Sequence, residues 1–140
     1  MTNEMATDFE TLLHQNNLKV TPQRIAILNE IAVLGHATID EIYEKIKTLY
    51  PSISLATIYK NIISLQEVNI IHELKLPNQK QHYEIVKSPH IHLVCNTCGI
   101  IVDMDVPYHK FVQSCAQQSD YKITEAMIAL LGICPRCQIS

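Results

Sequence analysis

The 140-residue sequence predicts an α+β protein, with helices in its first half and strands joined by a metal ion in its second. Three observations lead to this fold class. Four segments before residue 66 space their apolar residues as helices do, a two-strand hairpin pattern follows them, and two matching Cys-x-x-Cys pairs stand in the second half. A chain of this length forms one domain or two small ones, and small domains have thin cores that a metal ion can support.

The first helix is predicted from apolar spacing and the second from a capping residue as well. Residues 8–16 carry Phe9 and two leucines at helical spacing. A second helix begins after Thr21, a capping residue followed by Pro22 at the first helical position, and stops at Gly35.

Two further helices are predicted from the same kinds of signal. The third opens on a capping box, Thr38 to Glu41, and ends before Pro51. Ser54 caps the fourth. We expect the inner faces of these two helices to bury Ile42, Ile46, Leu49, Leu55, Ile58, Ile62 and Leu65.

A hairpin pattern follows the fourth helix, with strands at 69–76 and 81–86 on either side of a Pro77-Asn78 turn. Helices followed by such a hairpin form a winged helix-turn-helix, whose last helix enters the major groove of DNA. The fourth helix would point polar residues outward, among them Thr57, Lys60 and Asn61. The plainer interpretation is a small helical domain with a solvated polar stripe.

Charge weakens the DNA interpretation. Residues 1–84 hold 7 basic and 10 acidic residues, a net charge of −3. Proteins that bind nucleic acid usually carry a basic patch. Lys19, Arg24 and Lys60 could still gather on one face, and a dimer would double that face. On pattern alone, DNA binding stays open.

Four cysteines fall in two pairs, Cys95 with Cys98 and Cys134 with Cys137, separated by 35 residues. Each pair on its tight turn can direct two sulfurs at one tetrahedral ion, as zinc–thiolate sites do. Redox-active pairs or disulfides are the alternative, and the matching pairs favour structural zinc. We expect the remaining Cys115 to be a small buried residue and not a ligand.

A second set of metal-binding side chains gathers around the middle of the chain. His90 and His92 alternate, so both rings would leave one face of a strand. Asp103 lies on the next strand, Glu84 ends the hairpin, and His36 follows Gly35. These nitrogens and carboxylates suit Fe(II), Mn(II) or Zn(II). The other histidines are predicted to be ordinary surface or hairpin residues: His14, His72, His82 and His109.

The N-terminal residues show no basic region followed by an apolar run, and no stretch approaches 18 uninterrupted apolar residues. We therefore expect a cytoplasmic protein without a membrane partner.

Five segments resemble the ferric uptake regulator (Fur) family, in the family's order and over nearly the whole chain. They are Val20-Thr-Pro-Gln-Arg24, Gly35-His-Ala-Thr-Ile-Asp-Glu-Ile-Tyr43, Ser54-Leu-Ala-Thr-Ile-Tyr-Lys-Asn61, His90-Ile-His-Leu-Val-Cys-Asn-Thr-Cys-Gly99 and Gly132-Ile-Cys-Pro-Arg-Cys137. The resemblance implies a homodimer that binds double-stranded promoter DNA through a winged-helix domain at 1–84. It also implies an α/β dimerisation domain at 85–140.

The resemblance assigns roles to residues as well. Structural Zn(2+) would be held by Cys95, Cys98, Cys134 and Cys137. A regulatory Fe(2+) or Mn(2+) would be held by His36, Glu84, His90, His92 and Asp103. We expect DNA contacts from Lys19, Arg24, Thr57, Tyr59, Lys60 and Asn61.

Asp103 resembles the peroxide-sensing branch of the family, whereas the iron-uptake branch has glutamate there. Glu84 departs from that branch, which commonly has aspartate at this position. A peroxide sensor would oxidise His36 and His90 to 2-oxo-histidine in a sacrificial reaction, so we expect no enzyme. Alternatives are a reversible iron- or manganese-responsive regulator and, more remotely, a small non-haem iron enzyme or a metal-storage protein.

Overall fold

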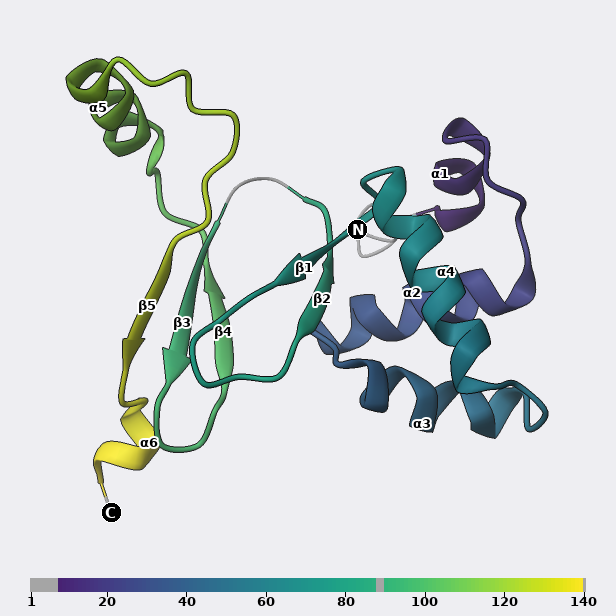
Figure 1. Ribbon diagram of the computed structural model, residues 1–140. Helices are drawn as coiled ribbons and strands as arrows, with labels where there is room; N and C mark the ends of the chain where they lie inside the picture. Colours follow the sequence, from purple (N-terminus) through teal and green to yellow (C-terminus); the bar gives the residue numbers. More distant parts are fainter. Residues whose placement is uncertain (1–7, 88–89, 140) are drawn as a thin grey trace, which may run out of the picture. The chain divides into compact units, whose positions relative to one another are not determined.

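The computed structural model describes residues 8–87 and 90–139 (Figure 1). Contacts between residues divide the chain into two compact units, Met1–Val86 and Lys87–Ser140, and each is described by itself. Within the described residues, the first, unit 1, contains four helices and a hairpin. The described part of the second, unit 2, contains a three-stranded sheet and two helices. The mixed helix-and-sheet fold confirms the predicted α+β class.

The helices of unit 1 are α1 (Phe9–Gln15), α2 (Pro22–Leu34), α3 (Ile39–Leu49) and α4 (Leu55–Glu67). The predicted starts of α2, α3 and α4 and the predicted ends of α2 and α3 are confirmed. The Thr21 hydroxyl accepts a hydrogen bond from the backbone of Arg24, and α2 ends at Gly35, whose φ of 79° favours glycine. Both hydrogen bonds of the Thr38–Glu41 capping box are present at the start of α3.

Unit 1 has its own hydrophobic core. It is built mainly from the buried faces of the helices and includes Leu13, Ile27, Leu28, Ile31, Ile42, Ile46, Ile58, Ile62 and Leu65. The prediction that Leu49 and Leu55 are buried is wrong, because their exposures are 55% and 41%. Leu49 is the last residue of α3 and Leu55 the first of α4, and the ends of a helix are less covered by neighbours than its middle.

The predicted hairpin is present as β1 (Ile71–Leu74) and β2 (His82–Ile85), paired antiparallel. Its register places His72 opposite Glu84 and Glu73 opposite Tyr83. Ala37 forms a separate antiparallel bridge with β2, because its N–H donates to the Tyr83 carbonyl at 2.9 Å and its carbonyl accepts from the Tyr83 N–H at 2.8 Å. The loop after α2 is thereby attached to β2.

The sheet of unit 2 has the strand order β4-β3-β5. β3 (Ile91–Cys95) pairs antiparallel with β4 (Ile101–Met104) and parallel with β5 (Ala129–Gly132). α5 (His109–Ser119) lies between β4 and β5 in sequence, and α6 (Pro135–Gln138) follows β5.

Unit 2 buries few of its side chains. Among its described residues, the buried hydrophobic ones are Ile91, Val94 and Cys95, and α5 contributes none. The prediction that Cys115 is buried is therefore wrong, since this α5 residue is exposed. No helix in the described parts of the chain is long and apolar enough to cross a membrane.

Candidate metal centres

The structure brings the four paired cysteines together within unit 2. Their sulfur atoms all lie within 4.8 Å of one another, and the sulfurs of Cys98 and Cys134 are 3.8 Å apart. A tetrahedral zinc ion with sulfur ligands at about 2.3 Å spaces those ligands about 3.8 Å apart. The cluster therefore fits a four-thiolate zinc site.

Two backbone contacts hold the cysteine turns against each other. Cys95 ends β3, and its sulfur accepts a hydrogen bond from the N–H of Cys134 in the other pair at 3.3 Å and, within its own turn, from the N–H of Cys98 at 3.4 Å. The N–H of Asn96 also donates to the carbonyl of Gly132 at the end of β5, at 2.8 Å. The parallel pairing of β3 and β5 thus places the second cysteine pair beside the first.

Hydrogen bonding within the cluster also shifts the pKa of two of these thiols when no metal is bound. Hydrogen bonds from Cys134 and Cys98 backbone groups lower the pKa of Cys95 to about 5. Hydrogen bonding with the Cys134 thiol is the chief reason that the pKa of Cys137 is raised to about 12. Zinc binds thiolates, so loading the site releases the protons that remain.

His36 and Glu84 form a contact within unit 1. The Ala37–Tyr83 backbone pairing brings the residue before Ala37 beside the residue after Tyr83, and the distance from His36 Nε2 to Glu84 Oε2 is 3.2 Å. The Glu84 side chain is only 1% exposed. A buried carboxylate is costly unless it is paired or binds a metal ion, so this contact indicates a polar site.

His72 approaches the second oxygen of the same carboxylate. Its Nε2 lies 2.6 Å from Glu84 Oε1, while the ring stays 42% exposed. This contact was missed from the sequence, where His72 was predicted to be an ordinary hairpin residue. A signal was present, because His72 and Glu84 lie equally far from Asn78 in the turn, and a symmetric hairpin pairs such residues.

His90, His92 and Asp103 gather within unit 2. The Nε2 atoms of the two histidines are 3.1 Å apart, as their alternation along the strand predicts. β4 places Asp103 opposite His92, and Asp103 Oδ1 lies 3.7 Å from His90 Nε2 and 3.6 Å from His92 Nε2. The other carboxylate oxygen, Oδ2, accepts a hydrogen bond from Lys87 Nζ at 2.8 Å.

The five predicted regulatory-metal residues thus form two internally connected groups. Unit 1 supplies one imidazole and one carboxylate, and unit 2 supplies two imidazoles and one carboxylate. Imidazole nitrogen and carboxylate oxygen are ligands that Fe(II), Mn(II) and Zn(II) accept, so each group is chemically suited to such an ion.

Several residues predicted to contact DNA also interact with one another. Arg24 Nε donates to Asn61 Oδ1 at 3.0 Å, and Arg24 Nη1 donates to the Lys19 carbonyl at 2.8 Å. The Asn61 amide in turn donates to the Thr57 carbonyl, one turn earlier in α4. The exposed side chains include Lys19, in the segment before α2, and three residues of α4, namely Thr57, Tyr59 and Lys60.

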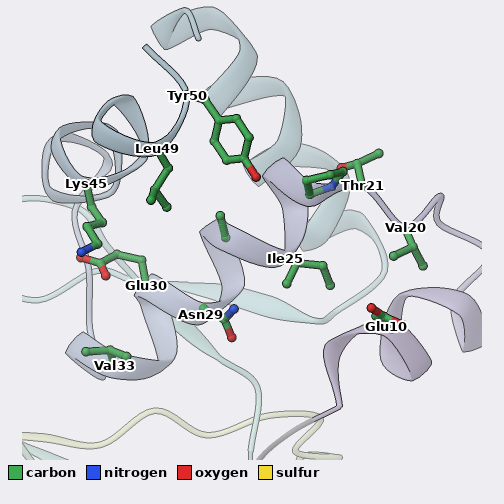
Figure 2. Close-up of a pocket in the computed structure, with 12 residues that line it drawn as sticks. Glu10, Val20, Thr21, Ile25, Asn29, Glu30, Val33, Lys45, Leu49 and Tyr50 are labelled. Atoms are coloured by element: carbon green, nitrogen blue, oxygen red, sulfur yellow. The ribbon is translucent and has the colours of Figure 1, made fainter. Parts of the chain in front are cut away.

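A groove of about 630 Å³ lies elsewhere on unit 1, between α2 and the end of α3 (Figure 2). Apolar side chains such as Ile25, Val33 and Leu49 line most of it, and Figure 2 shows Lys45 and Glu30 pointing toward each other at one end. Its lining contains no histidine or cysteine among the described residues. The groove therefore belongs to neither candidate metal centre.

Comparison with known proteins gives consistent matches. Residues 15–131 match the sequence profile described as the ferric uptake regulator family. A peroxide-responsive repressor, PerR, of Staphylococcus saprophyticus is 34% identical over 146 residues, covering 96% of this chain and 99% of that protein.

Solved structures also resemble the fold, and two of them illustrate the likeness. The Campylobacter jejuni peroxide stress regulator is 35% identical, with a TM-score of 0.76 and coverage of 94% of this chain and 100% of that one. The Vibrio cholerae ferric uptake regulator is 27% identical, with a TM-score of 0.75 and coverage of 91% and 100%.

Proposed function

Because this chain belongs to the ferric uptake regulator family, we propose that it is a metal-dependent, DNA-binding transcriptional repressor that senses peroxide in the cytoplasm. The observation that carries the proposal is the similarity to a peroxide-responsive repressor along almost the entire length of both proteins. The two groups of candidate metal ligands supply the chemistry that such a sensor needs.

Structural zinc is the first ion in the proposal. Cys95, Cys98, Cys134 and Cys137 would hold it, and the 3.8 Å spacing of Cys98 and Cys134 sulfurs supports this role. The ion would join the turn after β3 to the start of α6. It would stabilise unit 2, whose buried core is small, and would take no part in sensing.

The second ion in the proposal is the regulatory one. We assign its ligands to His36 and Glu84 in unit 1 and to His90, His92 and Asp103 in unit 2. Three nitrogens and two oxygens suit Fe(II) or Mn(II). An ion bound by residues of both units favours the arrangement of the units that completes the ligand set. It thereby increases the population of one conformation in proportion to its differential affinity.

Peroxide would act through the imidazole ligands. The chemistry that bound Fe(II) supplies is reduction of peroxide to an oxidant that adds one oxygen atom to a neighbouring imidazole ring. His36 and His90 are the rings that we expect to be modified, one from each unit. A 2-oxo-histidine is a poorer nitrogen ligand, so the modified chain would release its metal ion and then dissociate from DNA.

DNA binding would use a homodimer. In each chain α4 would enter the major groove, with Thr57, Lys60 and Asn61 near the bases and phosphates and Arg24 holding Asn61 in place. The unit 2 sheet supports dimer formation, since Val102, Leu130 and Leu131 are 44%, 52% and 45% exposed and line an apolar cavity of about 300 Å³. Exposed apolar surface of this kind is typical of an interface.

Peptide mass spectrometry of the Fe(II)-loaded protein after brief exposure to peroxide tests the proposal, with the Mn(II)-loaded protein as the control. We expect one added oxygen on the peptide that contains His36 or His90, only with iron. Loss of promoter binding, measured on the same samples, should follow the modified fraction.

Unmodified histidines at full iron occupancy would contradict peroxide sensing and favour a reversible iron- or manganese-responsive regulator. Glu84 is the feature that favours this second candidate. It stands where the sequence resemblance leads us to expect aspartate in a peroxide sensor.

A further inference from the structure

Both carboxylates of the proposed regulatory site have their two oxygen atoms turned to different partners. Glu84 directs Oε2 at His36, at 3.2 Å, and Oε1 at His72, at 2.6 Å. Asp103 directs Oδ1 at His90 and His92, at 3.7 and 3.6 Å, and Oδ2 at Lys87, at 2.8 Å. The same division of oxygens thus occurs independently in each unit.

We propose that His72 and Lys87 are positioning residues that each hold one oxygen of a ligand carboxylate, so that Glu84 and Asp103 each offer a single oxygen to the regulatory ion. This inference rests on the proposed function, because it concerns how the proposed ligands bind. Neither His72 nor Lys87 belongs to the ligand set itself.

The backbone explains why these two partners are well placed. His72 and Glu84 are directly opposed on β1 and β2, and opposed side chains project from the same face of a hairpin. The Glu84 carboxylate is buried, so its rotation is restricted and a hydrogen bond to Oε1 fixes the direction of Oε2. Lys87 adds a charge-assisted hydrogen bond to Asp103, which belongs to a stronger class than neutral pairs.

The hydrogen bonds to Glu84 Oε1 and Asp103 Oδ2 limit the number of atoms that these carboxylates can give to the ion. Five residues that each give one atom supply three nitrogens and two oxygens, one donor fewer than the six of an octahedral set. A carboxylate that bound through both oxygens would take a further position. His72 and Lys87 would therefore keep room for a small molecule such as peroxide.

The test measures Mn(II) affinity of the zinc-loaded, full-length protein by electron paramagnetic resonance. We expect His72→Phe and Lys87→Met each to weaken binding about 10-fold or more, the usual effect of removing a partner that orients a metal ligand. His72→Gln and Lys87→Arg keep a hydrogen-bond donor and should restore most of the affinity. His82→Phe, on the same hairpin, and Lys110→Met, an exposed lysine of unit 2, are matched controls.

A second readout reports the binding mode directly. Co(II) placed in the regulatory site has ligand-field absorption that weakens as the coordination number rises. We expect weaker absorption in His72→Phe and Lys87→Met, and wild-type absorption in His72→Gln and Lys87→Arg. Wild-type affinity and spectra in His72→Phe and Lys87→Met would overturn the inference. A loss of affinity that the conservative variants do not restore, with unchanged spectra, would also overturn it, because it would indicate a general structural effect.

Failure of the inference is distinguishable from failure of the proposed function. His36→Ala and His90→Ala remove proposed ligands, so both should lose Mn(II) binding far beyond 10-fold if the site is correct. If they keep wild-type affinity, the proposed site is wrong and the inference falls with it. If they lose binding while His72→Phe and Lys87→Met do not, only the inference is wrong.

Discussion

Removal of the proposed structural zinc should unfold unit 2 and leave unit 1 folded. The perturbation is Cys98→Ser, which removes one of the four clustered sulfurs. Cys115→Ser is the matched control, because Cys115 is exposed on α5 and lies outside the cluster.

The expected size of the effect comes from the small core of unit 2. Its two buried aliphatic side chains are Ile91 and Val94, at 6% and 3% exposure, as far as the described residues go. Burying two such side chains contributes roughly 3–6 kcal/mol. Structural zinc contributes about 10–16 kcal/mol of apparent binding free energy in small zinc-dependent folds. The ion therefore outweighs the core, whereas the larger core of unit 1 contains no zinc ligand among its described residues.

Hydrogen–deuterium exchange with peptide resolution is the assay, combined with zinc analysis and size-exclusion chromatography. We expect peptides of β3, β4 and β5 to lose protection in Cys98→Ser, while peptides of α2, α3 and α4 keep it. The proposed dimer should be lost in the same variant, because unit 2 would carry its interface. Protected β3–β5 peptides in a zinc-free protein would refute the reasoning, since the remaining contacts would then suffice.

Three further predictions concern the capping box, DNA and peroxide. Thr38→Ala removes the hydroxyl that accepts from the Glu41 N–H and should cost about 0.5–2 kcal/mol in the free energy of unfolding, measured by chemical denaturation; an unchanged midpoint would contradict this. Lys60→Ala should weaken binding similarly for all DNA sequences and reduce the slope of log affinity against log salt by about 1, measured by fluorescence anisotropy; an unchanged slope would exclude a phosphate contact. Asp103→Glu should blunt release from DNA by peroxide while metal-dependent binding persists; full peroxide sensitivity would show that Asp103 does not discriminate.

Local signals explain how much of the fold could be predicted from the sequence. Thr21, Gly35 and Thr38 act on the backbone within a few residues of themselves, so the ends of α2 and α3 can be predicted from sequence alone. The hairpin is similarly local. Apolar spacing, by contrast, says nothing about how far a neighbouring helix extends, which is why Leu49 and Leu55 were wrongly expected to be buried.

Long-range pairing was harder to predict. No signal in residues 129–132 identifies β5 as a parallel partner of β3, because the two strands are more than 30 residues apart in sequence. The four cysteines were nevertheless predicted to converge, since a shared tetrahedral ion requires it whatever the intervening fold. His72 was missed because its contact with Glu84 depends on the register of the hairpin and not on its own neighbours in sequence.

The attachment of the loop after α2 to β2 bears on the fate of the oxidised protein. The two hydrogen bonds between Ala37 and Tyr83 are made by backbone atoms, and the His36 side chain takes no part in them. We therefore expect oxidation of the His36 ring to leave this backbone pairing in place. Under the proposed function, a modified chain that stays folded would persist as an intact, inactive protein, because proteases in the cell remove mainly unfolded chains. Repression would then return only as newly synthesised chains accumulate, so the lifetime of the protein, and not the lifetime of peroxide, would set the length of the response.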